Sequence, residues 1–207
     1  MSAPTLPSVV RWPVPIALAI PALAAAVVVT FSAGHSAAFG MLVFGGFAVL
    51  TAIAAAIGGL LLPAGAARIG AVLKAVAAAV GGTLAFALPI GAGAQAAAVL
   101  AWTIGGTLAA LAADDIVVGA RLRHRDRYAR DWITTGIVEA LGAIVVVAVP
   151  PTFFQAFSFT DKGELVSGEV TSSTMIVGLF GAAAAVLGVF LAIAGIGLVP
   201  SRSRATA

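Results

Sequence analysis

Long apolar runs, separated by short segments that contain Gly, Pro, Ser or charged residues, organise this chain. Each run has about the 20 residues that an α-helix needs to cross a bilayer. The pattern therefore predicts six transmembrane helices, over residues 12–31, 37–62, 69–88, 95–118, 132–149 and 173–199. The predicted fold class is an all-α integral membrane protein, with a single transmembrane domain over residues 1–207.

A glycine-centred pattern recurs in every second apolar run. FGMLVFGGFAVLTAIAAA begins at Phe39 and VLAWTIGGTLAALAADDI at Val99, which aligns Gly45 with Gly105 at an offset of 60. The same frame reaches Gly181 in MIVGLFGAAAAVLGVFLA. Such a period predicts three stacked helical hairpins, approximately over residues 11–62, 68–118 and 130–199. Because each hairpin has two spans, the repeats are parallel, whereas inverted repeats are typical of transporters.

The composition agrees with a membrane protein and removes several kinds of chemistry. Hydrophobic residues make up 61% of the chain and charged residues 9%, with a mean hydropathy of +1.14. Six spans leave no room for a folded extramembrane domain, which argues against ATP-driven chemistry. The chain has no cysteine, so disulfides, thiol nucleophiles and thiolate metal sites are excluded.

Basic residues lie almost entirely on one side of the predicted topology. The other side has Lys162 and the acidic residues Asp161, Glu164 and Glu169. By the positive-inside rule, both termini are cytoplasmic in a bacterial plasma (inner) membrane, and the basic residues contact anionic lipid headgroups rather than nucleic acid. The basic residues on the inner side are Arg11, Arg68, Arg121, Arg123, Arg125, Arg127, Arg130, Arg202 and Arg204.

Aromatic residues fall near the predicted membrane surfaces, as interfacial anchors do. The inner set is Trp12, Tyr128 and Trp132, and the outer set is Phe153, Phe154, Phe157 and Phe159. The outer segment that contains these phenylalanines is predicted to be a solvated turn, because its acidic residues lack the spacing of a calcium loop.

Small residues follow one face of the last predicted helix. This strip consists of Gly181, Ala185, Gly188, Ala192 and Gly195. Helix backbones approach closely along such strips, so it indicates helix packing, with the lining of a permeation path as the alternative. We expect Leu187 to face a looser surface than Gly188 does.

The sequence predicts no catalytic residue, no cofactor and no metal site, and thus no enzyme. The two histidines, His35 and His124, belong to opposite ends of the predicted topology and cannot share a metal. No GxSxG nucleophile elbow is present, and the Gly-rich stretches lie inside apolar helices rather than in a phosphate loop. A lipid-modifying enzyme with a metal site at Asp114 and Asp115 ranks last, because further acidic partners at helical spacing are missing.

Ionisable residues inside the predicted spans form the candidate functional cluster: Lys74, Asp114, Asp115 and Glu139. Counting residues from the inner ends of the helices predicts one common depth, in the cytoplasmic third. Charges at depth are costly and indicate function by default, but a structural salt-bridge cluster is the competing interpretation. We expect Lys74 to contact Glu139, and the aspartates to meet the arginine loop between residues 121 and 130.

The pattern resembles the HdeD-type acid-resistance membrane proteins. The resemblance is clearest in RDWITTGIVEALGAIVVVAVPP followed by STMIVGLFGAAAAVLGVFLAIAGIGL. It implies a non-enzymatic, six-helix bacterial protein of envelope or acid-stress protection, and it supplies no catalytic or binding residue. The alternative is a small transporter or proton-coupled permease that uses the charged cluster. A homo-oligomer is compatible with either interpretation.

Overall fold

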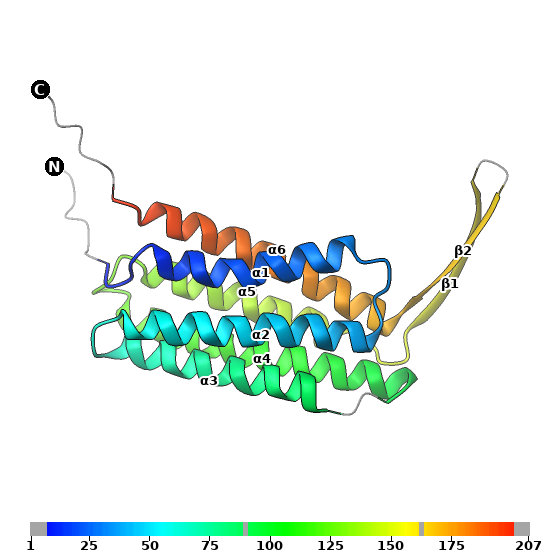
Figure 1. Cartoon of the computed structure of the whole chain (residues 1–207), viewed down its shortest axis with the longest axis horizontal. Coiled ribbons are helices and arrows are strands. Elements are labelled where there is room, and N and C mark those ends of the chain that lie inside the picture. The colour runs from blue at the N-terminus through cyan, green and yellow to red at the C-terminus, as the bar shows by residue number, and fades with distance from the viewer. Residues whose placement is uncertain (1–7, 89–90, 162–163, 201–207) are drawn as a thin grey trace, which may run out of the picture.

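A computed structural model describes residues 8–88, 91–161 and 164–200, in which six long helices run side by side (Figure 1). The helices are α1 (Pro13–Phe31), α2 (Ala37–Leu60), α3 (Ala66–Ala87), α4 (Gly93–Leu122), α5 (Ala129–Val147) and α6 (Ser172–Gly197). They match the predicted runs closely, although α4 extends further toward its carboxyl end. Lys162, Arg202 and Arg204 lie outside the described residues.

Five of these helices, α1, α2, α3, α4 and α6, are long and apolar enough to cross a membrane. These five helices indicate a membrane protein. Helix α5 differs in composition, because Arg130, Asp131 and Glu139 fall within its 19 residues. It nevertheless runs alongside the other helices of the bundle (Figure 1).

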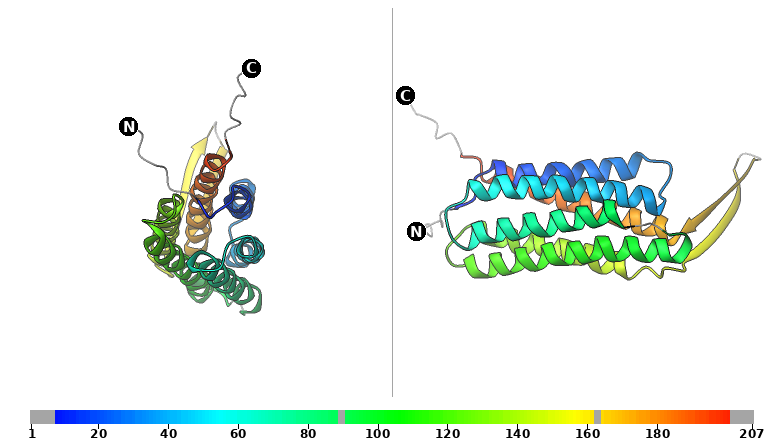
Figure 2. Two further views of the ribbon diagram at one scale, coloured as in Figure 1. Left: turned by 90° about the vertical axis from the view of Figure 1, so that its left-hand side faces the viewer. Right: turned by 60° about the horizontal axis from the view of Figure 1, so that its bottom comes forward.

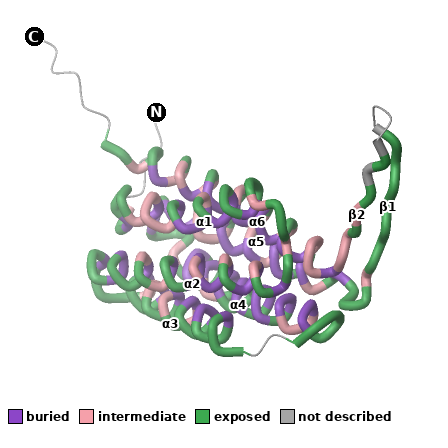
Figure 3. Tube along the Cα trace, turned by 45° about the vertical axis from the view of Figure 1, so that its right-hand side comes forward, coloured by how far each residue is buried: buried purple, intermediate pink, exposed green. Residues whose placement is uncertain are grey.

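Seen end-on, the helices form a closed arrangement in which α1 packs against both α2 and α6 (left view of Figure 2). The even-numbered helices α2, α4 and α6 also contact one another across the middle. Buried residues accordingly concentrate on their inner faces (Figure 3). Phe180 of α6 packs edge-on against Phe44 and Phe47 of α2, at ring-centroid distances of 5.4 and 5.6 Å.

The closest helix contacts lie between each even-numbered helix and one odd-numbered neighbour. A Cβ atom on Gly45 would lie 2.7 Å from Phe86 Cζ of α3, and one on Gly181 would lie 2.6 Å from Val29 Cγ1 of α1. Gly105 meets Val147 of α5 in the same way. Only glycine allows these backbones to approach so closely.

The small-residue strip of α6 lies along α1. Gly188 faces Leu23, and Gly195 faces Ile16. The expectation for Leu187 is wrong, because its side chain is only 5% exposed and belongs to the core. Helix α6 contacts α1 on one side and α2 and α4 on the other, so two of its faces are buried.

The outer segment is an exposed β hairpin rather than the predicted turn, and it adds a small two-stranded sheet to the otherwise helical fold. Strands β1 (Phe154–Asp161) and β2 (Glu164–Thr171) pair antiparallel, from Phe154 opposite Thr171 to Asp161 opposite Glu164. Phenylalanine and hydroxyl residues alternate from Phe157 to Thr160, which is the period of a strand. The hairpin projects beyond the helices (Figure 1), so Phe157 and Phe159 do not form a belt around the bundle.

Candidate functional site

Three of the four predicted cluster residues meet inside the bundle. Lys74 Nζ of α3 lies 2.6 Å from Asp115 Oδ2 of α4 and 3.4 Å from Glu139 Oε1 of α5. The predicted contact between Lys74 and Glu139 is thus present, but Asp115 is the nearer partner. All three side chains are buried, with exposures of 7% or less.

Small residues bring the three helices close enough for these side chains to meet. On α3, Gly70 faces Val118 of α4, one turn before Lys74 on the same side of the helix. On α5, Gly136 faces the Ala112 carbonyl oxygen of α4, and Glu139 follows one turn later. The lysine and the glutamate therefore both point toward the interior beside α4, where water is scarce.

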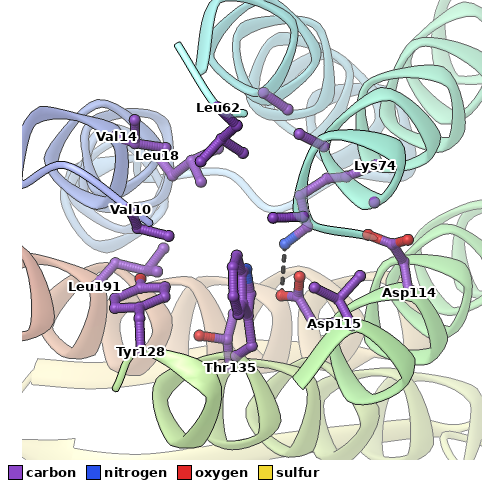
Figure 4. A pocket seen from close by; sticks show the side chains of 16 residues that line it. Val10, Val14, Leu18, Leu62, Lys74, Asp114, Asp115, Tyr128, Thr135 and Leu191 are labelled. Atoms are coloured by element: carbon purple, nitrogen blue, oxygen red, sulfur yellow. Dashed lines mark hydrogen bonds and ion pairs between the residues drawn. The ribbon is translucent and has the colours of Figure 1, made fainter. Parts of the chain in front are cut away.

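Asp114 does not join this ion cluster. Adjacent residues of a helix point about 100° apart, and the Asp114 carboxylate lies apart from the Lys74–Asp115 pair, on the side of α4 that faces Gly70 of α3 (Figure 4). It is partly exposed and lies beside Gly70. Within the described ranges both ion pairs belong to Lys74, so the expected contact of the aspartates with the arginine loop is not formed there.

The arginine loop makes other contacts. Arg127 donates a hydrogen bond of 2.7 Å to the carbonyl oxygen of Gly197, in the last turn of α6. Cations near the last carbonyls of a helix are favourable, because the negative end of the helix dipole lies there. The loop thus fastens the end of α6 to the connection between α4 and α5.

A cavity of about 40 Å³ adjoins the ion cluster (Figure 4). Since a buried water needs roughly 10–15 Å³ of such space and polar partners, the cavity has room for about three waters. This volume is large enough for a few water molecules, which could carry a proton, but too small for an organic solute. Its polar side comprises Lys74, Asp114, Asp115, Tyr128, Trp132 and Thr135, and its apolar side includes Val10, Val14, Leu18, Ala55, Leu62 and Leu191.

The segment before α1 lines one side of this cavity. The backbone N–H of Val9 donates a hydrogen bond of 2.9 Å to Asp126 Oδ2, and Tyr128 N–H donates one of 2.7 Å to Asp126 Oδ1. The Asp126 side chain is buried, and Val10 packs into the cavity wall. One carboxylate therefore fixes both the amino-terminal segment and the start of α5.

Tyr128 was predicted to be an interfacial anchor, and this is wrong, because its side chain is only 3% exposed. Its ring packs edge-on against Trp132 at a centroid distance of 5.1 Å. Burial raises the pKa of the Tyr128 phenol above its usual range, and the carboxylates of Asp115 and Asp131 add to the increase. The spacing of Tyr128, Trp132, Thr135 and Glu139 follows one helix face, a signal by which the sequence could have grouped them.

Glu139 has one oxygen that the cluster does not use. Glu139 Oε2 is buried and, among the described residues, has no hydrogen-bond partner. The side chain borders a second cavity of about 10 Å³, whose other lining residues are apolar: Phe47, Leu108, Val138, Phe180, Ala183, Ala184 and Leu187. The hydroxyl of Thr51 is likewise buried without a partner in the described part of the chain.

The cluster is chemically a lysine held between two carboxyl groups. Lys74 Nζ occupies the space between Asp115 and Glu139, so the cation that bridges them belongs to the chain itself. In the described ranges, His, Asp and Glu side chains form no group of three or more that could hold a metal ion. The arrangement is suited to binding water and protons.

Comparisons of the chain with protein-family models, with curated proteins and with solved structures return no match.

Proposed function

We propose that the chain crosses a bacterial plasma membrane six times, with both termini and the arginine loop in the cytoplasm. Helix α5 has a length similar to that of α1 and lies within the same bundle, which supports a sixth span. Helix α1 begins and α6 ends at the same end of the bundle (Figure 1), as an even number of spans requires. Exposed arginines of the loop at this end would contact anionic headgroups.

The three predicted hairpins are also part of this proposal. The aligned glycines Gly45, Gly105 and Gly181 face α3, α5 and α1 respectively, so equivalent positions make equivalent contacts. The contact between α1 and α6 closes the series. This cyclic pattern supports a parallel repeat, in which each even-numbered helix packs closely on the first helix of the next hairpin.

We propose that the protein is a non-enzymatic membrane component that protects the envelope under acid stress, as its resemblance to the HdeD-type proteins suggests. The observation that supports this proposal is the Lys74–Asp115–Glu139 cluster, which joins α3, α4 and α5 inside the bundle. A proton that reached Asp115 would remove the charge that balances Lys74. The packing of three helices would then depend on protonation, which is a physical link between acid and the state of the bundle.

Survival of a deletion strain at low pH tests this function. We expect the deletion to reduce survival or envelope integrity in acid without abolishing the uptake of any single nutrient. The parent protein should restore survival, whereas Lys74→Met with Asp115→Asn, expressed at an equal level in the membrane, should not. Equal survival of the deletion and parent strains in acid would refute the stress function.

A second candidate, a small proton-coupled permease, is favoured by one observation. The cavity beside Lys74 and Asp115 is lined on one side by a short segment whose backbone is held by Asp126. Asp126→Ala should release this segment and increase proton flux into proteoliposomes that contain a pH-sensitive dye. A proton flux equal to that of vesicles with the parent protein would argue against this candidate. A substrate-specific transport defect in the deletion strain would favour the permease over the stress function.

A further inference from the structure

The charges of the buried cluster do not balance if every group is ionised. One lysine faces two carboxyl groups, at 2.6 and 3.4 Å, and all three side chains are at least nine-tenths buried. Two ionised carboxylates would leave a net negative charge inside an apolar bundle. An uncompensated charge in such a place is far more costly than a neutral carboxylic acid.

The surroundings distinguish the two carboxyl groups. Asp115 makes the shorter contact with Lys74 Nζ and borders the cavity that has room for water. Glu139 makes the longer contact through Oε1, while its Oε2 atom is buried without a partner and the side chain borders the apolar cavity. A negative charge is therefore better accommodated on Asp115, and a proton on Glu139.

The other helices bring no further charge to the two cavities. Among the described lining residues, the titratable side chains are Lys74 from α3, Asp114 and Asp115 from α4, Tyr128 from the preceding connection and Glu139 from α5. Residues of the amino-terminal segment, α1, α2 and α6 that line the cavities are apolar. Asp114 is partly exposed and, within the described ranges, forms no ion pair with Lys74, so it is the matched neighbour against which Glu139 can be tested (Figure 4).

We propose that the cluster is a proton-binding site that holds one exchangeable proton on Glu139, which leaves Lys74 and Asp115 as a neutral ion pair. The proton comes from solvent and forms an O–H bond to the Glu139 carboxylate, and no other covalent bond changes. Water in the cavity beside Lys74 and Asp115 would reach the cluster from that side, and the proton would pass between this water and Glu139 through the cluster. The site exists whether the protein serves acid protection or transport.

The same chemical change at the two carboxyl groups should have opposite effects on stability. Glu139→Gln imitates the protonated acid in size and charge, so its melting temperature in detergent should equal or exceed that of the parent. Asp115→Asn removes the charge that balances Lys74 and should lower the melting temperature by roughly 6–20 °C. A loss of stability in Glu139→Gln as large as that in Asp115→Asn, or failure of Glu139→Gln to fold, would overturn the proposal.

Infrared spectroscopy reads the proton directly and does not need the Asp115 variant. The parent protein at neutral pH should show the C=O band of a protonated carboxylic acid, which shifts when water is replaced by deuterium oxide. Glu139→Gln should lose this band, and Asp114→Asn should keep it. A band that persists in Glu139→Gln and disappears in Asp114→Asn would place the proton on the partly exposed aspartate and overturn the assignment. Absence of the band from the parent would also overturn it. These results are independent of acid survival, so the site and the proposed function fail separately.

Discussion

The pairing of Lys74 with Asp115 should dominate the energetics of the cluster. At an effective dielectric constant of about 20, two unit charges 2.6 Å apart attract by roughly 6 kcal/mol, before the cost of burying them is counted. Removing one member of a buried pair typically costs about 3–5 kcal/mol, because the other charge keeps its desolvation penalty. We therefore expect Asp115→Asn and Lys74→Met each to destabilise the protein by about that amount.

The double variant Lys74→Met with Asp115→Asn should be less damaging than the sum of the single changes. It leaves no unbalanced charge, and only an amide and a methionine remain beside the cavity. We expect a total loss of about 1–3 kcal/mol, and hence a coupling energy of at least about 3 kcal/mol. The coupling between Lys74 and Glu139 should be smaller, because their contact is longer.

Reversible unfolding of the four proteins in mixed detergent micelles gives the four free energies that the cycle needs. The parent and the three variants must be measured in the same micelles, because the reference state depends on them. Losses that add within about 0.5 kcal/mol would mean that Lys74 and Asp115 do not interact in the membrane protein, and the reasoning from their distance would be refuted.

Three further predictions concern packing, topology and the single tyrosine. Gly188→Leu should destabilise the protein by about 1–3 kcal/mol, because Leu23 of α1 lies against Gly188. The control Gly178→Leu, on the open side of α6, should have little effect. Equal melting temperatures of the two variants would refute the contact. In intact cells an impermeant maleimide should label Ser167→Cys, whereas His124→Cys should react only after permeabilisation, and the reverse pattern would invert the topology. Tyr128 is the chain's only tyrosine, so its phenolate absorbance should appear in the folded protein only at a higher pH than in the unfolded chain. Stability should accordingly fall as the pH rises above the usual tyrosine pKa, since the unfolded state ionises first, and coincident absorbance titrations of the folded and unfolded protein would contradict the burial of the ring.

Hydrophobic patterning determined the extents of the helices and the depth of the charges. Apolar runs bounded by charged and turn residues set the lengths of the helices, and depth follows from counting residues along a helix with a fixed rise. Lys74 and Glu139 could therefore be expected at one level. The first strand of the β hairpin could also have been predicted from the alternation between Phe157 and Thr160, since that signal is local.

The choice of partners depended on tertiary structure. Depth says nothing about the rotation of a helix, and Asp114 and Asp115 are adjacent in sequence but about 100° apart around α4. Packing at glycines fixes that rotation: Gly70 of α3 against Val118, and Gly105 against Val147 of α5, turn Asp115 rather than Asp114 toward Lys74.

The contact of the amino-terminal segment with the cavity could not be predicted from the sequence either. The hydrogen bond from Val9 to Asp126 joins residues 117 positions apart, and neither residue stands out from its neighbours in the chain. Tyr128 has the composition of an interfacial anchor, yet the amino-terminal segment lies beside it and removes it from solvent. Burial of a side chain near a helix end depends on which distant segment packs over it, and the folded chain alone decides that.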